Sequence, residues 1–160
     1  MIHYSLFRGK AAFMLIELIV TLLVLSVLAT IGVATYSNSY RQSVLKNSFE
    51  EIIFLIRLAQ QESVSQKEGN AWGVRLDNTN TSSPFVAVFS STYAPANVKE
   101  YYSLPNQVKF QTPSAGNYDE VLFQKLTGLP DASSTIELVL SGSSQVKTIV
   151  INSAGGISEE

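Results

Sequence analysis

Cysteine is absent from the sequence, and histidine occurs once, as His3. Without cysteine, neither a disulfide framework nor thiolate chemistry is available. His3 precedes a long apolar segment, so loss of the first dozen residues would leave no imidazole in the chain. Histidine-dependent nucleophile pairs and histidine-ligated zinc sites are then excluded. The glycine pattern of nucleotide-binding loops is also missing. We therefore expect neither an enzyme nor a bound cofactor or metal.

Charged residues are sparse, at 15% of the chain, and the net charge is −2. Lysine and arginine are scattered and form no basic run. Removal of the first dozen residues would take away Arg8 and Lys10 and bring the net charge to −4. Because phosphate binding depends on clustered positive charge, we expect no nucleic-acid partner.

An almost continuous apolar run extends from Phe13 to Tyr36. About 20 apolar residues suffice for a helix to cross the hydrocarbon layer of a membrane. The run follows a short basic segment, which by the positive-inside rule places the N-terminus in the cytoplasm and the rest outside. The sequence thus predicts a short N-terminal segment, 1–12, and a transmembrane half-helix, 13–36.

The helical pattern continues beyond the apolar run, over residues 37–68. Apolar residues there advance by four and three positions, which is typical of one face of an α-helix. They are Leu45, Phe49, Ile52, Ile56 and Ala59. We predict one helix from about Phe13 to Glu68, with Gly32 as its weakest point, because glycine inside a helix costs about 1 kcal/mol relative to alanine.

Residues 69–160 show the alternation of a soluble β-rich domain. Turn-rich stretches separate the predicted strands, and the last two strands form a predicted hairpin. The predicted strands are Trp72–Leu76, Phe85–Phe89, Glu100–Leu104, Val108–Gln111, Val121–Leu126, Ile136–Leu140 and Val146–Ile151. The fold class is therefore α+β, with the amphipathic half of the helix covering one sheet face.

Glu17 stands out inside the apolar run, since a carboxylate in a membrane helix costs roughly 2.5–3.5 kcal/mol on insertion scales. A cut between Ala12 and Phe13 would create an α-amino group four residues before Glu17. In a helical assembly, the amine of one subunit could pair with Glu17 of its neighbour. Assembly would then remove the cost of an isolated carboxylate and set the axial register.

The stretch from Lys10 to Val20, KAAFMLIELIV, closely resembles the processing site of type IV prepilins and pseudopilins. The resemblance implies that a prepilin peptidase removes a basic leader before Phe13, that the new Phe13 amine is N-methylated, and that Glu17 is the fifth mature residue. The family normally has glycine before the cut, whereas this chain has Ala12. Cutting after Gly9 instead would put Glu17 at the wrong distance from the new terminus.

The soluble domain resembles the H-type minor pseudopilins of type II secretion (GspH) and the related FimT minor pilins. The resemblance lies in NAWGVRL from Asn70, SLPNQVKF from Ser103 and KTIVINSAGGI from Lys147. It implies two small antiparallel sheets beside the helix.

These observations predict a structural minor pilin or pseudopilin of a type II secretion pseudopilus or a type IV pilus. Its expected partners are other pilin or pseudopilin subunits, a prepilin peptidase, the cytoplasmic membrane and an assembly platform. The domain would lie outside that membrane before entry into the filament. An alternative is a binding module at a pilus tip, either a DNA-uptake receptor or an adhesin.

Several simpler interpretations stand beside these. The apolar run could be a secretory signal cut after Ala34, or a plain single-pass anchor without a filament. Trp72 is expected in the core, and Tyr101 and Tyr102 on opposite faces of a strand. The stretch Asp77–Thr81 is expected to be a polar turn, because the glycine and distal glutamate of a calcium loop are missing.

Overall fold

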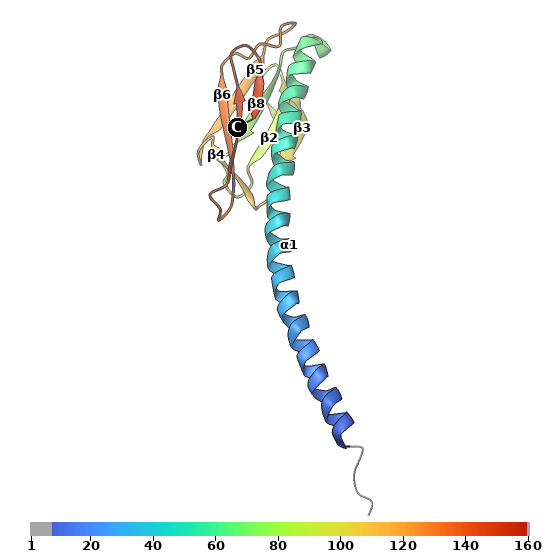
Figure 1. Ribbon diagram of the computed structural model, residues 1–160. Coiled ribbons are helices and arrows are strands. Elements are labelled where there is room, and N and C mark those ends of the chain that lie inside the picture. Colours follow the sequence, from blue (N-terminus) through green and yellow to red (C-terminus); the bar gives the residue numbers. More distant parts are fainter. Residues whose placement is uncertain (1–7, 160) are drawn as a thin grey trace, which may run out of the picture. The chain divides into compact units, whose positions relative to one another are not determined.

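The computed structural model describes the backbone of residues 8–159 and the side chains of residues 15–30 and 36–159. The chain divides into two compact units, Met1–Tyr40 and Arg41–Glu160, which we describe separately. Helix α1 (Arg8–Val64) supplies the described part of the first unit and the opening segment of the second (Figure 1). Most of the predicted leader, residues 1–7, lies outside the described residues.

Helix α1 differs from the prediction at both ends. It begins at Arg8, before the predicted start at Phe13, and it ends at Val64 rather than Glu68. Beyond Val64 the backbone leaves the helical conformation, since Gln66 and Glu68 adopt left-handed φ angles of 51° and 56°, which an α-helix does not accommodate. A short 3₁₀ turn, η1 (Lys67–Gly69), then leads into the first strand.

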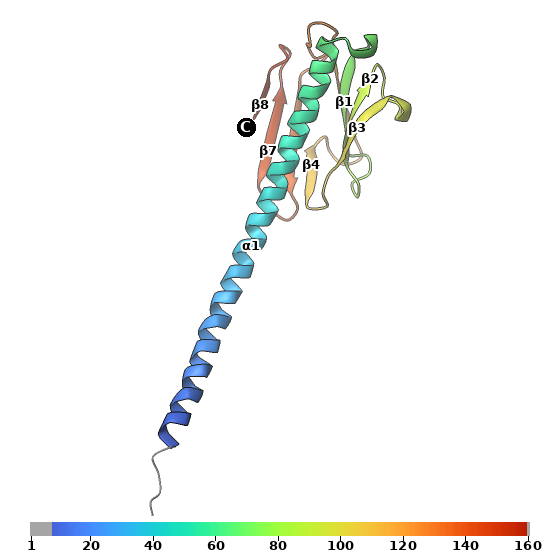
Figure 2. The same cartoon turned by 90° about the vertical axis from the view of Figure 1, so that its right-hand side faces the viewer.

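The second unit contains two four-stranded antiparallel sheets (Figures 1 and 2). Sheet A has the strand order β3-β2-β1-β5, and sheet B has the order β4-β6-β7-β8. The strands are β1 (Trp72–Asp77), β2 (Phe85–Ser90), β3 (Val98–Ser103), β4 (Val108–Thr112), β5 (Tyr118–Phe123), β6 (Ser134–Leu140), β7 (Val146–Ile151) and β8 (Ile157–Glu159), with a 3₁₀ turn, η2 (Pro95–Asn97), before β3. The α+β class and the two small antiparallel sheets are confirmed.

One core joins the second-unit part of α1 to the inner faces of both sheets. The helix contributes the five apolar residues of its predicted face, from Leu45 to Ala59, and all five are buried. Sheet A contributes inward residues such as Val74 and Val86, and sheet B contributes Ile136 and Ile149. Figure 2 shows α1 running past β7 and β8 on one side and β1 and β3 on the other. The helix thus covers both sheets, rather than the single sheet face that we predicted.

The strand predictions hold except at the ends of some elements. The hairpin of β6 and β7 is confirmed, with Val139 opposite Val146. The fifth strand was predicted to reach Leu126 but ends at Phe123, because Leu126 adopts a left-handed φ of 67° inside a tight turn. Strand β8 was not predicted, since Ile157–Glu159 is too short to show an alternating pattern; it pairs with β7.

Candidate functional site

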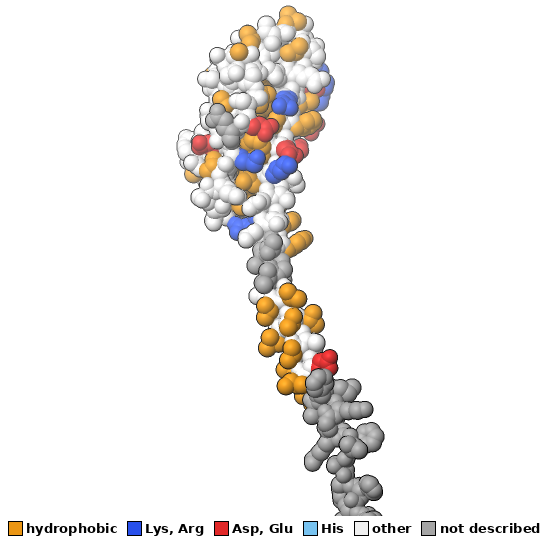
Figure 3. All heavy atoms as spheres, viewed as in Figure 1, with side chains coloured by type: hydrophobic (Ala, Val, Ile, Leu, Met, Phe, Trp, Pro, Cys, Tyr) orange, Lys and Arg blue, Asp and Glu red, His pale blue; other side chains and the backbone are white. Residues whose placement is uncertain are grey.

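The described apolar stretch of α1 in the first unit, residues 15–30, presents its side chains outward. Its large aliphatic residues are between 49% (Val24) and 62% (Leu15) exposed. Figure 3 shows hydrophobic side chains over this stretch, with an acidic side chain among them. An apolar surface of this extent is a feature of interaction sites rather than of isolated soluble proteins. Within the residues that the structure describes, no helix combines the length and apolar character needed to cross a membrane.

Hydroxyl groups in this stretch are bonded within the helix itself. Thr21 donates to the Leu18 carbonyl over 2.9 Å, and Ser26 donates to the Leu23 carbonyl over 2.7 Å. Thr30 donates to the carbonyl of Ser26 over 2.8 Å. Such bonds to the preceding turn satisfy the hydroxyl in an apolar setting. The surface around them can therefore contact other apolar groups without leaving a hydroxyl unpaired.

The predicted site residues all lie on α1. Glu17 is exposed, between Ile16 and Leu18, which are also exposed. Ala12 and Phe13 lie within the bounds of α1, but their side chains are outside the described residues, as is that of Gly32. The Glu17 carboxylate is thus available to a partner, whereas the cleavage site stays a prediction.

Ser63 fixes the end of α1 to sheet A in the second unit. The Trp72 backbone N–H donates to the Ser63 hydroxyl over 2.6 Å. The same hydroxyl donates to the Phe123 carbonyl over 2.9 Å. The Leu126 N–H also donates to the Ser63 carbonyl. Ser63 is fully buried, so these bonds satisfy groups that water cannot reach.

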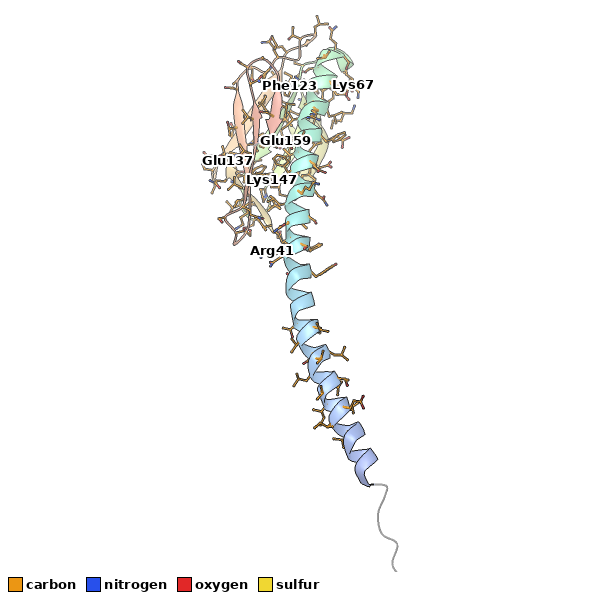
Figure 4. All side chains as sticks on the ribbon, in the orientation of Figure 1. Arg41, Lys67, Phe123, Glu137, Lys147 and Glu159 are labelled. Atoms are coloured by element: carbon orange, nitrogen blue, oxygen red, sulfur yellow. The ribbon has the colours of Figure 1, made fainter. Side chains whose placement is uncertain are left out.

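Further contacts join α1 to the C-terminal part of the second unit. The Gln60 amide donates to the carbonyls of Gly128 and Gly155, both over 2.9 Å. Lys147 on β7 places its ammonium 4.5 Å from the centre of the Phe49 ring, and Figure 4 shows it near the helix. Arg41, also labelled there, donates to the Ser141 carbonyl. The helix is therefore held to the sheets by polar bonds as well as by the core.

The outer face of sheet A carries an arginine enclosed by aromatic rings and carboxylates. The Arg75 guanidinium carbon lies 3.7 Å from the Tyr118 ring centre and 4.3 Å from that of Tyr93. Its nitrogens bond Asp77, at 2.8 and 2.7 Å, and Glu120, at 2.6 Å. The guanidinium is thus contacted by two aromatic rings and two carboxylates.

This arrangement shifts the pKa of two groups. Burial by itself would lower the pKa of Arg75, but hydrogen bonds to Asp77 and Glu120 outweigh it and raise that pKa. Burial by itself would raise the pKa of Asp77, but bonds from Thr79 and from Arg75 lower it. Both shifts favour the charged forms, so the cluster is an ion pair at neutral pH.

The aromatic predictions are confirmed. Trp72 is 1% exposed in the core. Tyr102 points inward and donates to the Ser48 hydroxyl over 2.9 Å, whereas Tyr101 is 57% exposed on the opposite face. Asp77, expected in a polar turn, is the last residue of β1, and its carboxylate accepts from the Thr79 amide over 2.9 Å.

The Arg75 cluster was missed by reasoning from the sequence. The alternation from Trp72 to Asp77 does place Arg75 and Asp77 together on the face opposite to the core. Their partners Glu120 and Tyr118 come from β5, whose register against β1 is set by tertiary pairing. No local signal in the sequence indicates that register.

Comparison with known proteins finds similarity in structure only. No protein-family profile matches the sequence, and no curated protein matches it significantly. Two crystal structures of the type IV minor pilin FimU of Pseudomonas aeruginosa are similar to this chain. One matches with a TM-score of 0.52 at 17% identity, over 74% of this chain and 91% of FimU. The other matches with a TM-score of 0.55 at 16% identity, over 78% and 90%.

The similarity covers most of both chains and agrees with the resemblance of the sequence to type IV pilin-like proteins. At this level of identity, the comparison is evidence about the fold. The chain therefore has a type IV pilin-like fold, similar to that of the minor pilin FimU.

Proposed function

We propose that this protein is a non-catalytic minor pilin or pseudopilin, a structural subunit of a type II secretion pseudopilus or a type IV pilus. The proposal is supported by two features that occur together in this chain. A fold similar to that of a type IV minor pilin follows an exposed apolar helix that carries Glu17. The H-type resemblance of residues 70–157 favours a minor subunit over a major one.

The proposed route begins at the cytoplasmic membrane. The apolar run Phe13–Tyr36 inserts as a helix, and the basic leader, residues 1–12, keeps the N-terminus on the cytoplasmic side. Residues 37–68 and 69–160 then lie outside the membrane. A prepilin peptidase cuts between Ala12 and Phe13, and the new Phe13 amine is methylated.

Assembly moves the apolar half of the helix from lipid into a bundle of equivalent helices. Residues 14–33 supply the core of the filament, where small residues such as Ala29 and Gly32 allow close helix packing. The Phe13 amine of one subunit pairs with Glu17 of another, so each charge gains a partner that it lacks in lipid. This pairing favours one axial register. The partners are other pilin-like subunits and the platform that transfers them.

The test is the intact mass and N-terminal sequence of the full chain after co-expression with a prepilin peptidase. We expect a product that starts at Phe13 and carries one methyl group. Ala12→Gly should be cut faster than the natural chain, since glycine is the family's residue at this position. A product that starts at Thr35 would identify a secretory signal instead. A chain left uncut in both versions would identify a plain membrane anchor.

A further inference from the structure

Two tyrosines on the outer face of sheet A are exposed to a similar extent but have different surroundings. Tyr118, on the edge strand β5, is 54% exposed, and Tyr101, on the opposite edge strand β3, is 57% exposed. Tyr101 stacks on Phe85 with ring centres 4.9 Å apart. Tyr118 stacks on Arg75 instead, within the ion-pair cluster. Of these two tyrosines, Tyr118 is therefore the one that belongs to a charged site.

The Tyr118 ring is fixed before any partner arrives. Arg75 lies 3.7 Å from one face of the ring and is itself held by Tyr93, Asp77 and Glu120. The exposure of Tyr118 leaves much of the ring open to solvent. A rigid aromatic surface loses little conformational entropy on binding, which favours its use in recognition.

The charge around this ring favours a cation. Arg75 is shared by two carboxylates, so the cluster carries one negative charge in excess. Asp77 is buried, whereas the Glu120 side chain is 35% exposed. Glu120 lies two residues after Tyr118 on β5, so both side chains project from the same face of the strand. A partly exposed carboxylate, one oxygen of which is bonded to Arg75, thus lies on the same face of β5 as the Tyr118 ring.

Within the cluster, tyrosine rings and carboxylates already bind one guanidinium, that of Arg75. Arg75 lies close to the rings of two tyrosines and bonds two carboxylates. The uncovered part of the Tyr118 ring, together with the partly exposed carboxylate of Glu120 from the same face of β5, offers related chemistry to a second cation. A guanidinium fits better than an ammonium, because it is planar, stacks on rings and bonds carboxylates in a fork.

We propose that Tyr118 and Glu120 form a docking site for an arginine side chain of a partner protein. The guanidinium stacks on the ring of Tyr118 and donates to the carboxylate of Glu120. Cation–π contacts and exposed ion pairs each contribute modestly, so an isolated arginine binds the site weakly and saturates it only at high peptide concentration.

The test uses the full chain in detergent micelles, with isotope-labelled tyrosine rings observed by NMR. The probe is a capped glycine–serine peptide that contains two arginines, and the control is the same peptide with glutamine at both positions. We expect the Tyr118 ring signals to shift saturably with the arginine peptide and to lose this response at high salt. The glutamine peptide should leave them unchanged.

Variants then distinguish binding at this site from non-specific binding to exposed aromatic rings. Binding by the variants is followed by fluorescence anisotropy of dye-labelled peptide, because replacing Tyr118 removes its own ring signal. Tyr118→Leu should abolish this binding, and Glu120→Gln should weaken it by about fivefold. Tyr118→Phe keeps the ring on Arg75 and should bind like the natural chain, which covers the case in which the leucine variant fails to fold. Tyr101→Leu is the matched control, because Tyr101 is equally exposed but lies outside the charged cluster. Fluorescence of the buried Trp72 reports whether each variant is folded.

Several outcomes would overturn the proposal. These are an equal loss in the Tyr101 variant, no effect of Glu120→Gln, or no saturable shift at all. Saturable binding of a neutral oligosaccharide or a DNA oligonucleotide at Tyr118, in place of the arginine peptide, would identify another class of partner. The result is independent of the proposed filament role, which is decided by processing at Phe13.

Discussion

At the scale of single residues, Ser63 shows how a small polar side chain determines where α1 ends. It is fully buried, and its hydroxyl accepts from Trp72 and donates to the Phe123 carbonyl. The first strand and the fifth strand thereby meet the last turn of the helix at one side chain. Hydrophobic periodicity identifies apolar residues that face the core. It therefore does not indicate that a serine on the inner face of the helix bonds two strands.

We predict that Ser63→Ala lowers the free energy of unfolding by about 1–3 kcal/mol, because the buried Trp72 N–H would lose its acceptor. The measurement is urea unfolding of the full chain in detergent, followed by the fluorescence of Trp72, the only tryptophan. Ser65→Ala is the control, since Ser65 is exposed and its hydroxyl donates to the Glu62 carbonyl in the same turn of the chain. Equal effects of the two substitutions would contradict the role assigned to Ser63.

At the scale of elements, the turn before β8 is attached to α1 by Gln60. A Cβ atom added at Gly155 would lie 2.9 Å from the Gln60 amide nitrogen and 3.2 Å from the Gly128 carbonyl oxygen. Gly155 also has a φ of +81°, which favours glycine. A side chain at Gly155 would therefore displace the Gln60 amide and press on the Gly128 carbonyl.

Gly155→Ala should destabilise the second unit more than Gly116→Ala does. Gly116 has a similar φ of +83°, but nothing lies within 4 Å of its added Cβ, so its substitution measures the backbone cost alone, about 1 kcal/mol. The excess at Gly155 reflects displacement of Gln60. Hydrogen exchange should show faster exchange in β7 and β8 for Gly155→Ala only. Identical urea midpoints for the two variants would show that the close approach has no energetic weight.

At the scale of the whole molecule, the two units have opposite surface character. Most of the described side chains in residues 15–30 of the first unit are apolar and exposed, whereas the second unit buries most of its large apolar side chains in one core. Within residues 15–30, the helix itself leaves these apolar side chains uncovered. Such a stretch suits the proposed subunit, which moves from lipid into a bundle of helices, and in that proposal the pairing of Glu17 with the Phe13 amine gives the move its direction.

We predict that Glu17→Ala inserts into membrane at least as well as the natural chain but enters filaments far less. Insertion would become easier by roughly 2.5–3.5 kcal/mol, whereas the partner of the Phe13 amine would be lost. The measurement is the fraction of subunit in sheared filaments from cells with a working assembly platform. Glu50→Ala is the control, because Glu50 is an exposed glutamate of the second unit. Equal incorporation of Glu17→Ala and the natural chain would rule out the register role.

The sequence by itself determined the features that depend on local periodicity and composition. The apolar run, the stripe from Leu45 to Ala59 and most strands follow from side-chain spacing, because each residue's preference acts within a few neighbours. The position of Glu17 in a prepilin-like motif was also legible in this way. The predicted α+β class and two antiparallel sheets agree with the structure.

Only the tertiary structure decided how the elements meet. The end of α1 at Val64, the turn at Leu126 and the short β8 depend on partners distant in the sequence. The Arg75 cluster arises because the register of β1 against β5 places Glu120 opposite Arg75 and Tyr118 opposite Asp77. Register is set by simultaneous packing of both sheets on the helix, and a one-residue slip would turn each strand's core side chains toward solvent. Such a collective choice cannot be deduced from any single segment.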